Sequence, residues 1–317
     1  MNKQELRAGG LSAKPGEKVQ GFITVTDANY QMPATLINGA GQGKTFLITA
    51  GIHGGEYPCI QAAIELGKEL RPEEVNGQII IVHLVNPPAF NARLSYINPL
   101  DGKNINRQFP GDPKGTISQQ IAWFMTQELQ SQADFYLDIH GGDIHETLPP
   151  YAYYPGVASP EVVAASRAMA VKLKVDFMVK SSATTGAYNS AGIRGLPCIM
   201  IERGGSGLWS PEEVELYKKD ILTVLGAQGL IQGHDVVLDK EPMEITHAVY
   251  LDATCTGCWY PAAKVKETVK KGQKVGEIRD LFGQVLETYY ADFDSMILFV
   301  TTSLAISQGD PIITYGI

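Results

Sequence analysis

The sequence predicts an α/β protein with a mixed, mostly parallel sheet flanked by helices, followed by a small all-β domain. Apolar runs of strand length alternate with segments of helical periodicity over most of the chain. The run at residues 77–85 (GQIIIVHLV) is continuously apolar, as expected for a strand that is covered on both faces. Helical spacing is absent after about residue 239. We therefore expect an α/β domain at residues 1–238 and an all-β domain at residues 239–317.

Composition limits the classes of protein that need to be considered. Hydrophobic residues make up 44% of the 317 residues and charged residues 19%, values that are ordinary for a globular protein. The net charge is -8, and no basic cluster exceeds the pair Lys270-Lys271, which argues against a nucleic-acid or anionic-membrane surface. The first residues lack the apolar core of a signal peptide, and no apolar run reaches membrane-spanning length. We expect a cytoplasmic protein whose partner is a small molecule.

The four cysteines are too few to form a disulfide scaffold in a chain of this length. Cys255 and Cys258 have the spacing of a redox or zinc-ribbon motif, but the chain contains no second Cys-x-x-Cys pair. We interpret the two residues as structural thiols, with a local disulfide or a metal clip as the alternative.

The first part of the chain predicts a hairpin and then a strand–helix–strand unit. Residues 18–36 alternate between apolar and polar side chains, which favours a short hairpin ahead of the main fold. A strand begins at Phe46, and Pro58 can occupy the first turn of a helix that ends before Pro72. The next strand contains His83, which we interpret as a core residue because a lone histidine in an apolar run is more often buried than a ligand.

The remainder of the α/β region starts with a long loop. Residues 86–115 are rich in Pro, Asn and Gly and show no periodicity, and long loops in compact domains are commonly functional. Ser159-Pro160 and Ser210-Pro211 each combine an N-cap residue with a proline at the first helical position. The expected helices are 117–129, one beginning at 159, and 210–227, and the expected strands are 135–139, 151–154, 177–180 and 198–201.

Three predicted strands are each followed directly by a potential ligand and by glycines. His53 follows the strand that begins at Phe46, His140 follows the strand at 135–139, and Glu202 follows the strand at 198–201. Ligands bind at the carboxyl ends of strands in open α/β sheets, so these side chains can converge although they are far apart in sequence.

The residue types at these positions match a catalytic zinc site. His53, Glu56 and His140 would supply two imidazole nitrogens and one carboxylate, a set that leaves a coordination position open for water. Glu202 then remains available as a general base. For an isolated His-x-x-Glu the alternative is a surface turn after a strand. Asp138 could orient a ligand imidazole, either that of His53 or that of His140.

Four motifs in the same order resemble the succinylglutamate desuccinylase and aspartoacylase family of the zinc carboxypeptidase superfamily. They are His53-Gly-Gly-Glu56, Asn106-Arg107, Asp138-Ile-His140 and Ile201-Glu202. The resemblance implies a zinc-carboxypeptidase-like fold, one zinc ion per chain held by the first and third motifs, a substrate carboxylate bound by the second, and Glu202 as the catalytic base. The strings NPLDGKNINRQFPGDP and VKKGQKVGEIRDLFGQV are most similar to the subgroup that includes N-acetyl-diaminobutyrate deacetylases.

The resemblance also leads to expectations for residues around these motifs. The family uses an additional arginine to polarise the substrate carbonyl; Arg93 is the candidate here, since Ser95 stands at the aligned position. Independently of the resemblance, the polar residues Asp143, His145 and Glu146 are expected to be solvated loop residues, with contact to the substrate as the alternative. The all-β region resembles a biotinyl carrier domain but has no lysine at the tip, Asp294-Ser-Met-Ile297, so we expect a structural or cleft-covering role without an attached cofactor.

The implied function is that of a zinc-dependent amidohydrolase that removes an acyl group, acetyl by the subgroup resemblance, from an N-acylated small amino acid or related compound. Zinc activates a water molecule, and the carboxylate base moves its proton to the leaving amine. A zinc carboxypeptidase that cuts short peptides and a catalytically silent small-molecule binding protein are the alternatives. Neither a nucleic acid nor a membrane is expected as a partner, and assembly into a homo-oligomer is left open.

Overall fold

The computed structural model describes residues 4–25, 30–39, 41–234, 238 and 240–317. The largest sheet within these ranges has nine strands, in the order β14-β12-β11-β13-β9-β5-β6-β4-β3. Five neighbouring pairs are parallel and three, at β11/β13, β6/β4 and β4/β3, are antiparallel. The mixed, mostly parallel sheet predicted from the sequence is confirmed. Its strands are β3 (Glu17–Val25), β4 (Tyr30–Asn38), β5 (Thr45–Ala50), β6 (Gln78–Val82), β9 (Phe135–Ile139), β11 (Tyr151–Pro155), β12 (Phe177–Ser181), β13 (Cys198–Glu202) and β14 (Met243–Ile245).

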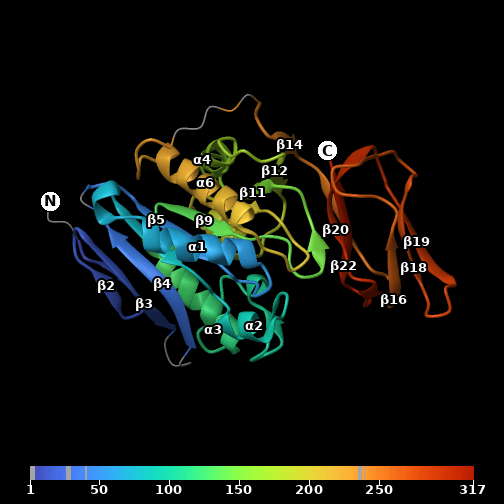
Figure 1. Cartoon of the computed structure of the whole chain (residues 1–317), viewed down its shortest axis with the longest axis horizontal. Helices are drawn as coiled ribbons and strands as arrows, with labels where there is room; N and C mark the ends of the chain where they lie inside the picture. Colours follow the sequence, from blue (N-terminus) through green and yellow to red (C-terminus); the bar gives the residue numbers. More distant parts are fainter. Residues whose placement is uncertain (1–3, 26–29, 40, 235–237, 239) are drawn as a thin grey trace.

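Helices cover both faces of this sheet (Figure 1). They are α1 (Tyr57–Glu69), α2 (Pro87–Ala92), α3 (Ile117–Phe124), α4 (Pro160–Ala170), α5 (Ala187–Ile193) and α6 (Pro211–Ala227). Apolar residues of α1, α4 and α6 form one buried cluster, and those of α3 and α5 form a second cluster. Successive residues of a strand point to opposite faces, so Leu47 of β5 belongs to the second cluster and Ile48 to the first. Burial on both faces explains why the central strands are continuously apolar in sequence.

The helix starts follow the signals in the sequence. The side chain of Ser159 accepts a hydrogen bond from the backbone N–H of Val162, and Ser210 does the same for Glu213. Each bond satisfies one of the free N–H groups of the first turn. Prolines lie at the first turn of α1, α4 and α6. None of the helices in the described ranges is long and apolar enough to cross a membrane.

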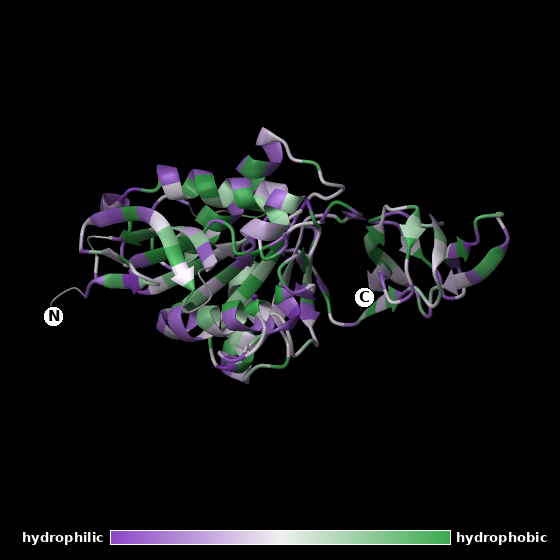
Figure 2. Cartoon of the chain, turned by 90° about the horizontal axis from the view of Figure 1, so that it is seen from below, coloured by the Kyte–Doolittle hydropathy of each residue, from purple (hydrophilic) through white to green (hydrophobic). Residues whose placement is uncertain are grey.

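The C-terminal part of the chain forms two antiparallel sheets at one end of the molecule (Figures 1 and 2). The two sheets enclose a separate apolar cluster that contains Trp259 and Tyr315. One sheet has the order β10-β20-β22-β15, with β17 also paired to β20, and the other has the order β19-β18-β16-β21. The strands are β10 (Glu146–Thr147), β15 (Ala248–Asp252), β16 (Gly257–Pro261), β17 (Thr268–Val269), β18 (Lys274–Arg279), β19 (Val285–Tyr290), β20 (Ser295–Thr301), β21 (Ala305–Ile306) and β22 (Pro311–Gly316).

The chain crosses between the two regions in both directions. β10 follows β9 of the large sheet but pairs with β20, while β14, close to the expected boundary at residues 238/239, pairs with β12 of the large sheet. The division into domains at 1–238 and 239–317 stays a prediction. Cys255 and Cys258 are half-buried free thiols.

Two local expectations from the sequence were wrong, and one helix was missed. The hairpin β3–β4 is not ahead of the main fold, because β4 pairs with β6 and the hairpin forms one edge of the large sheet. The expected loop at residues 86–115 contains α2, the short strands β7 (Ile97–Asn98) and β8 (Lys103–Asn104), and a 3₁₀ turn at Ile105–Arg107. Helix α5 was not expected, and the last turn of the helix at 117–129 is a π-helical turn, Met125–Leu129. The remaining short strands, β1 (Leu6–Ala8) and β2 (Leu11–Ala13), form a two-stranded sheet.

His83 is a core residue, as expected. It is 8% exposed, and its Nε2 lies 2.8 Å from the hydroxyl of Thr35. Burial lowers the pKa of its imidazole to about 4, so the ring is neutral in the folded protein at pH 7.

Candidate metal centre

The strands β13, β9 and β5 are parallel neighbours in the middle of the large sheet, and their carboxyl ends are in register. Ile139 pairs with Ala50 on one side and with Ile201 on the other. The next residues along β9 and β13 are His140 and Glu202, and the backbone N–H of His140 donates to the carbonyl of Ile201. Pairing of the strands therefore brings segments far apart in sequence to one edge of the sheet.

The loop after β5 turns sharply so that two of its side chains face the same point. Gly51 has φ of +66°, a conformation that side-chain-bearing residues rarely adopt. A Cβ atom on Gly54 would lie 2.3 Å from the backbone nitrogen of Phe90, so only glycine lets the loop pack against α2. This turn places His53 three residues before Glu56, which is the N-cap residue of α1.

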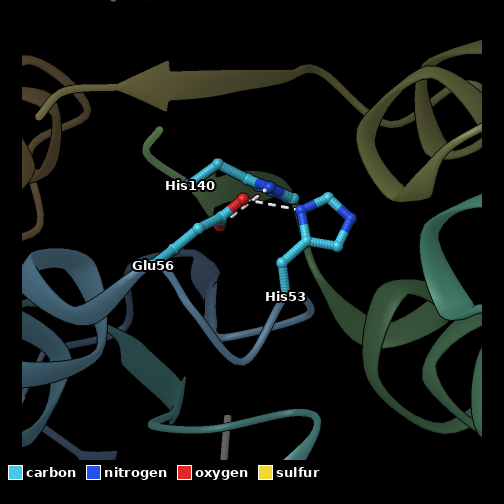
Figure 3. Close-up of side chains that lie close together, drawn as sticks. All are labelled: His53, Glu56 and His140. Carbon is cyan, nitrogen blue, oxygen red and sulfur yellow. Dashed lines mark hydrogen bonds and ion pairs between the residues drawn. The ribbon is translucent and has the colours of Figure 1, made fainter. Parts of the chain in front are cut away.

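His53, Glu56 and His140 form a compact donor set (Figure 3). One donor atom of each residue lies within 4.8 Å of the donor atoms of the other two. Nδ1 of His53 lies 2.6 Å from Oε1 of Glu56, and Nδ1 of His140 lies 3.2 Å from Oε2 of Glu56. Oε2 of Glu56 is buried and has no hydrogen-bond partner among the residues that the structure describes.

The other nitrogen of each imidazole faces an acceptor. Nε2 of His53 lies 3.3 Å from Oδ1 of Asn104, and Nε2 of His140 lies 3.1 Å from Oδ2 of Asp138. A proton on each Nε2, directed at these acceptors, leaves each Nδ1 able to present a lone pair toward Glu56. In that tautomer, two lone pairs and a carboxylate face one point, so the donor set fits a metal ion.

The electrostatics of the set agree with this interpretation. Burial disfavours the charged form of Glu56, but His140 and His53 outweigh burial and hold the pKa of its carboxyl at about 2. Burial also disfavours a charged His140, yet Glu56 and Asp138 raise the pKa of its imidazole well above the ordinary value. Both shifts show that this buried carboxylate stabilises positive charge at the position of the imidazoles.

Asp138 orients His140 and is itself held on both oxygens. It is fully buried, and the hydroxyl of Thr49 donates to its Oδ1 over 2.7 Å while its Oδ2 faces His140. Of the two roles left open by the sequence, the structure assigns Asp138 to His140. Tyr217 of α6 holds the backbone of this region in place. Its hydroxyl donates to the carbonyl oxygen of His140 and lies 2.9 Å from the carbonyl oxygen of Arg203.

Replacing Asp138 by Asn should weaken metal binding by about tenfold to a hundredfold, because the amide no longer supplies the charge that keeps Nδ1 of His140 basic. Competition with a chromophoric chelator measures the dissociation constant. Asp134→Asn is a matched control, since Asp134 precedes the same strand but is exposed and accepts from the N–H of Thr45. An unchanged dissociation constant in Asp138→Asn would contradict the orienting role.

Glu202 lies at the end of β13 beside the donor set. It is 9% exposed, and its Oε2 is buried without a hydrogen-bond partner within the described part of the chain. Burial raises the pKa of its carboxyl to about 8, an effect that the Glu56 and Asp138 carboxylates strengthen and His140 opposes. A cation held by the donor set would lower this pKa and leave Glu202 as a carboxylate that can accept a proton at pH 7.

The geometry agrees with the match to known proteins. A model of the succinylglutamate desuccinylase/aspartoacylase catalytic domain matches residues 42–227, which is more than half of the chain and includes the whole donor set and Glu202. The chain belongs to the succinylglutamate desuccinylase/aspartoacylase family. It is therefore a deacylase-like hydrolase whose His-Glu-His cluster is suited to a metal ion.

Relatives of the family share nearly the full length of the chain. The N-alpha-acetyl-L-2,4-diaminobutyric acid deacetylase of Halomonas elongata is 29% identical over 289 residues, covering 89% of this chain and 84% of that protein. The crystal structure of a succinylglutamate desuccinylase/aspartoacylase from Rhodobacter sphaeroides is 29% identical, with a TM-score of 0.82 over 94% of this chain and 95% of that one. The product-bound ectoine utilization protein EutE (DoeB) from Ruegeria pomeroyi is 26% identical, with a TM-score of 0.86 over 100% and 99% of the two chains.

The residues that the family resemblance suggested for substrate binding lie in the 3₁₀ turn Ile105–Arg107. Asn106 is 6% exposed, and its Oδ1 accepts from the backbone N–H of Ala187 over 2.8 Å. Arg107 is exposed and forms no ion pair with the described residues. Its guanidinium is therefore free to bind an anion from solution.

Arg93 caps the C-terminus of α2 in the left-handed conformation, with φ of 56° and an exposed side chain. It makes no hydrogen bond to the donor set in the ranges that the structure covers. Ser95 is adjacent to the donor set instead: its carbonyl accepts from the N–H of Gly55, and its hydroxyl oxygen is buried without a partner among the described residues. A carbonyl-polarising role for Arg93 stays a prediction.

The structure corrects two expectations near the site and adds one residue. Asp143 is 3% exposed rather than solvated, and its carboxylate accepts from the N–H of His145 over 2.7 Å. His145 is exposed, as expected, whereas Glu146 is half-buried in strand β10 and is not a solvated loop residue. Asn104, which orients His53, was not singled out, since the only signal was its place in an Asn-rich loop.

Proposed function

We propose that the chain is a zinc-dependent amidohydrolase that removes an acyl group from an N-acylated small amino acid, and that this acyl group is acetyl. The observation that carries the proposal is a His53–Glu56–His140 donor set with an unpaired, buried carboxylate, Glu202, beside it. Such sets with an open position are typical of catalytic zinc. The 29% identity to a deacetylase of an N-acetylated diamino acid supports acetyl as the acyl group.

Each residue has a defined part in this reaction. When bound, zinc would lower the pKa of water and polarise the scissile carbonyl. Glu202 accepts the proton of the attacking water and delivers it to the amine nitrogen as the amide C–N bond breaks, so that a carboxylate and a free amine are released. Asp138 and Asn104 hold the imidazoles of His140 and His53 in the orientation that ligation requires.

Turnover of a panel of N-acyl compounds tests this function. The zinc-loaded protein should hydrolyse N-acetyl amino acids faster than N-succinyl and N-aspartyl donors, and faster than short peptides with a free C-terminus. Preferential cleavage of peptides would favour a carboxypeptidase. Stoichiometric zinc without turnover of any compound would favour a silent binding protein.

Arg107 should bind the carboxylate on the amino-acid side of the amide. Arg107→Ala removes a charge-assisted pair that contributes about 1.5–3 kcal/mol, so kcat/KM for an N-acetyl amino acid should fall roughly tenfold to a hundredfold. The matching carboxamide, which lacks the charge, should be affected far less. Kinetics on the matched pair of substrates measures the difference.

Lys103→Ala serves as the control for Arg107, because it removes a cation from strand β8 of the same loop. It should leave the preference for carboxylate over carboxamide unchanged. Equal losses on both substrates in Arg107→Ala would mean that Arg107 supports the loop and that a free carboxylate is not required.

A further inference from the structure

One side chain of the C-terminal sheets contacts the large sheet close to Glu202. Tyr250 lies in β15, and its hydroxyl is 3.2 Å from the hydroxyl of Tyr153 in β11. Tyr153 is 8% exposed, whereas 53% of Tyr250 is exposed. The hydrogen bond therefore joins a core residue of the catalytic sheet to a residue that remains open to solvent.

Tyr153 is part of the wall beside Glu202. Tyr151 is the direct cross-strand neighbour of Glu202 in the antiparallel pair β11/β13, and Tyr153 is two residues further along the same face. Side chains opposite each other in such a pair have Cβ atoms about 4.5–5.5 Å apart. The rings of Tyr151 and Tyr153 contact edge to face, with centroids 5.2 Å apart. A row of contacts thus runs from Glu202 through Tyr151 and Tyr153 to Tyr250.

The same tyrosines adjoin the residues proposed to bind the amino-acid half of the substrate. Tyr188 of α5 packs against Tyr153, with ring centroids 6.2 Å apart. The residue before it, Ala187, donates its N–H to Oδ1 of Asn106. Tyr250 therefore belongs to the side of the site that carries Asn106 and Arg107.

Tyr250 is accessible to solvent, but its hydroxyl is partly desolvated. Although half of its side chain is accessible, burial raises the pKa of its hydroxyl, with the charge of Glu202 as a smaller contribution. A phenol that is accessible yet partly desolvated can exchange its present partner for a ligand at low cost.

The contact of Tyr250 does not hold the C-terminal sheets in place by itself. β10 pairs with β20, the N–H of Thr302 donates to the carbonyl of His145 over 2.7 Å, and Lys266 forms an ion pair with Asp176 over 2.7 Å. Removal of one hydroxyl should therefore leave the position of β15 unchanged.

We propose that Tyr250 is a specificity-determining residue that the C-terminal sheets contribute to the active site, where its phenol contacts the amino-acid half of the substrate. The inference rests on the proposed function and extends it, because it makes these sheets part of the substrate site. Tyr250 donates a hydrogen bond to a polar group of the amino acid, and its ring limits the size of the amino-acid side chain.

Tyr250→Phe should raise KM for an N-acetyl amino acid about three- to tenfold, the value of one neutral hydrogen bond, with kcat within twofold of wild type. Tyr250→Ala should raise KM further and improve the relative use of substrates with larger side chains. An N-alkylacetamide, which keeps the acyl group and lacks the amino acid, should be hydrolysed equally by wild type and Tyr250→Phe. Melting temperatures separate this result from a loss of stability and should agree within about 2 °C.

Tyr260→Phe is the matched control, because Tyr260 lies in β16 of the same region and is covered by the guanidinium of Arg279. It should leave KM unchanged. A KM within twofold of wild type in both Tyr250 variants, or equal losses on the N-alkylacetamide, would overturn the inference while leaving the amidohydrolase function in place.

Binding of an N-acetyl amino acid to zinc-loaded Glu202→Gln, with and without Tyr250→Phe, gives the same comparison without turnover. Absence of both turnover and binding in wild type would reject the proposed function and, with it, this inference.

Discussion

Glu202→Gln is expected to lower kcat by about a hundredfold or more while zinc remains bound. Glutamine keeps the shape of the side chain but cannot accept the proton of the attacking water, and proton transfer by a positioned group typically contributes about 10²–10⁴-fold. Glu202 is the buried carboxylate beside the donor set whose Oε2 lacks a hydrogen-bond partner in the described ranges. Steady-state kinetics together with metal analysis of the same preparation measures both parts of the prediction.

Glu287→Gln is a suitable control for this experiment, because Glu287 is an exposed carboxylate of β19 in the C-terminal sheets. Its kcat should equal that of wild type. Near-normal turnover in Glu202→Gln would place the base elsewhere, and loss of zinc would show that Glu202 ligates the metal.

His140→Ala is expected to lose most of its zinc on dialysis, and with the zinc its activity. The imidazole supplies one of three ligands, and no other described His, Cys, Asp or Glu completes the set at this position. Its loss also leaves Oδ2 of the fully buried Asp138 without its imidazole partner. Elemental analysis should show about one zinc per chain in wild type and a small fraction of that in the variant.

His145→Ala is the control for metal binding, since His145 lies five residues further along the chain and is exposed. It should retain full zinc occupancy. His53→Ala should behave like His140→Ala, because both Nδ1 atoms face Glu56. Full occupancy in both variants would reject the ligand assignment.

Much of the fold could be predicted from the sequence because the local signals agree with the tertiary environment. The central strands are apolar on both faces because helices cover both faces of the sheet. The helices after Ser159 and Ser210 begin where the cap and proline indicate. Helix α5 gave no such signal: it begins after Gly186, which has φ of +98°, and no side chain caps it.

Some residues of the candidate site could be predicted from the sequence, and others could not. His53, Glu56, His140 and Glu202 were identified because each follows a strand and has a residue type that suits zinc chemistry. The convergence of His53, Glu56 and His140 depends on β5, β9 and β13 being adjacent and parallel, which the structure shows. Asn104 has no local pattern, because a hydrogen bond to His53 across 51 residues leaves no periodicity in the sequence.

By itself the sequence determined the class of the fold, the order of most elements and the chemical types of the metal donors, because periodicity, capping and strand-end motifs are local properties of the chain. Only the tertiary structure decided that Asp138 serves His140 rather than His53, that Asp143 is buried, and that Tyr250 contacts Tyr153 near Glu202. The orientation of His140 depends on the pairing of β5 with β9, and the contact of Tyr250 depends on where β15 lies beside the large sheet. Such contacts join residues that are distant in sequence, and their geometry is set by the folded chain as a whole.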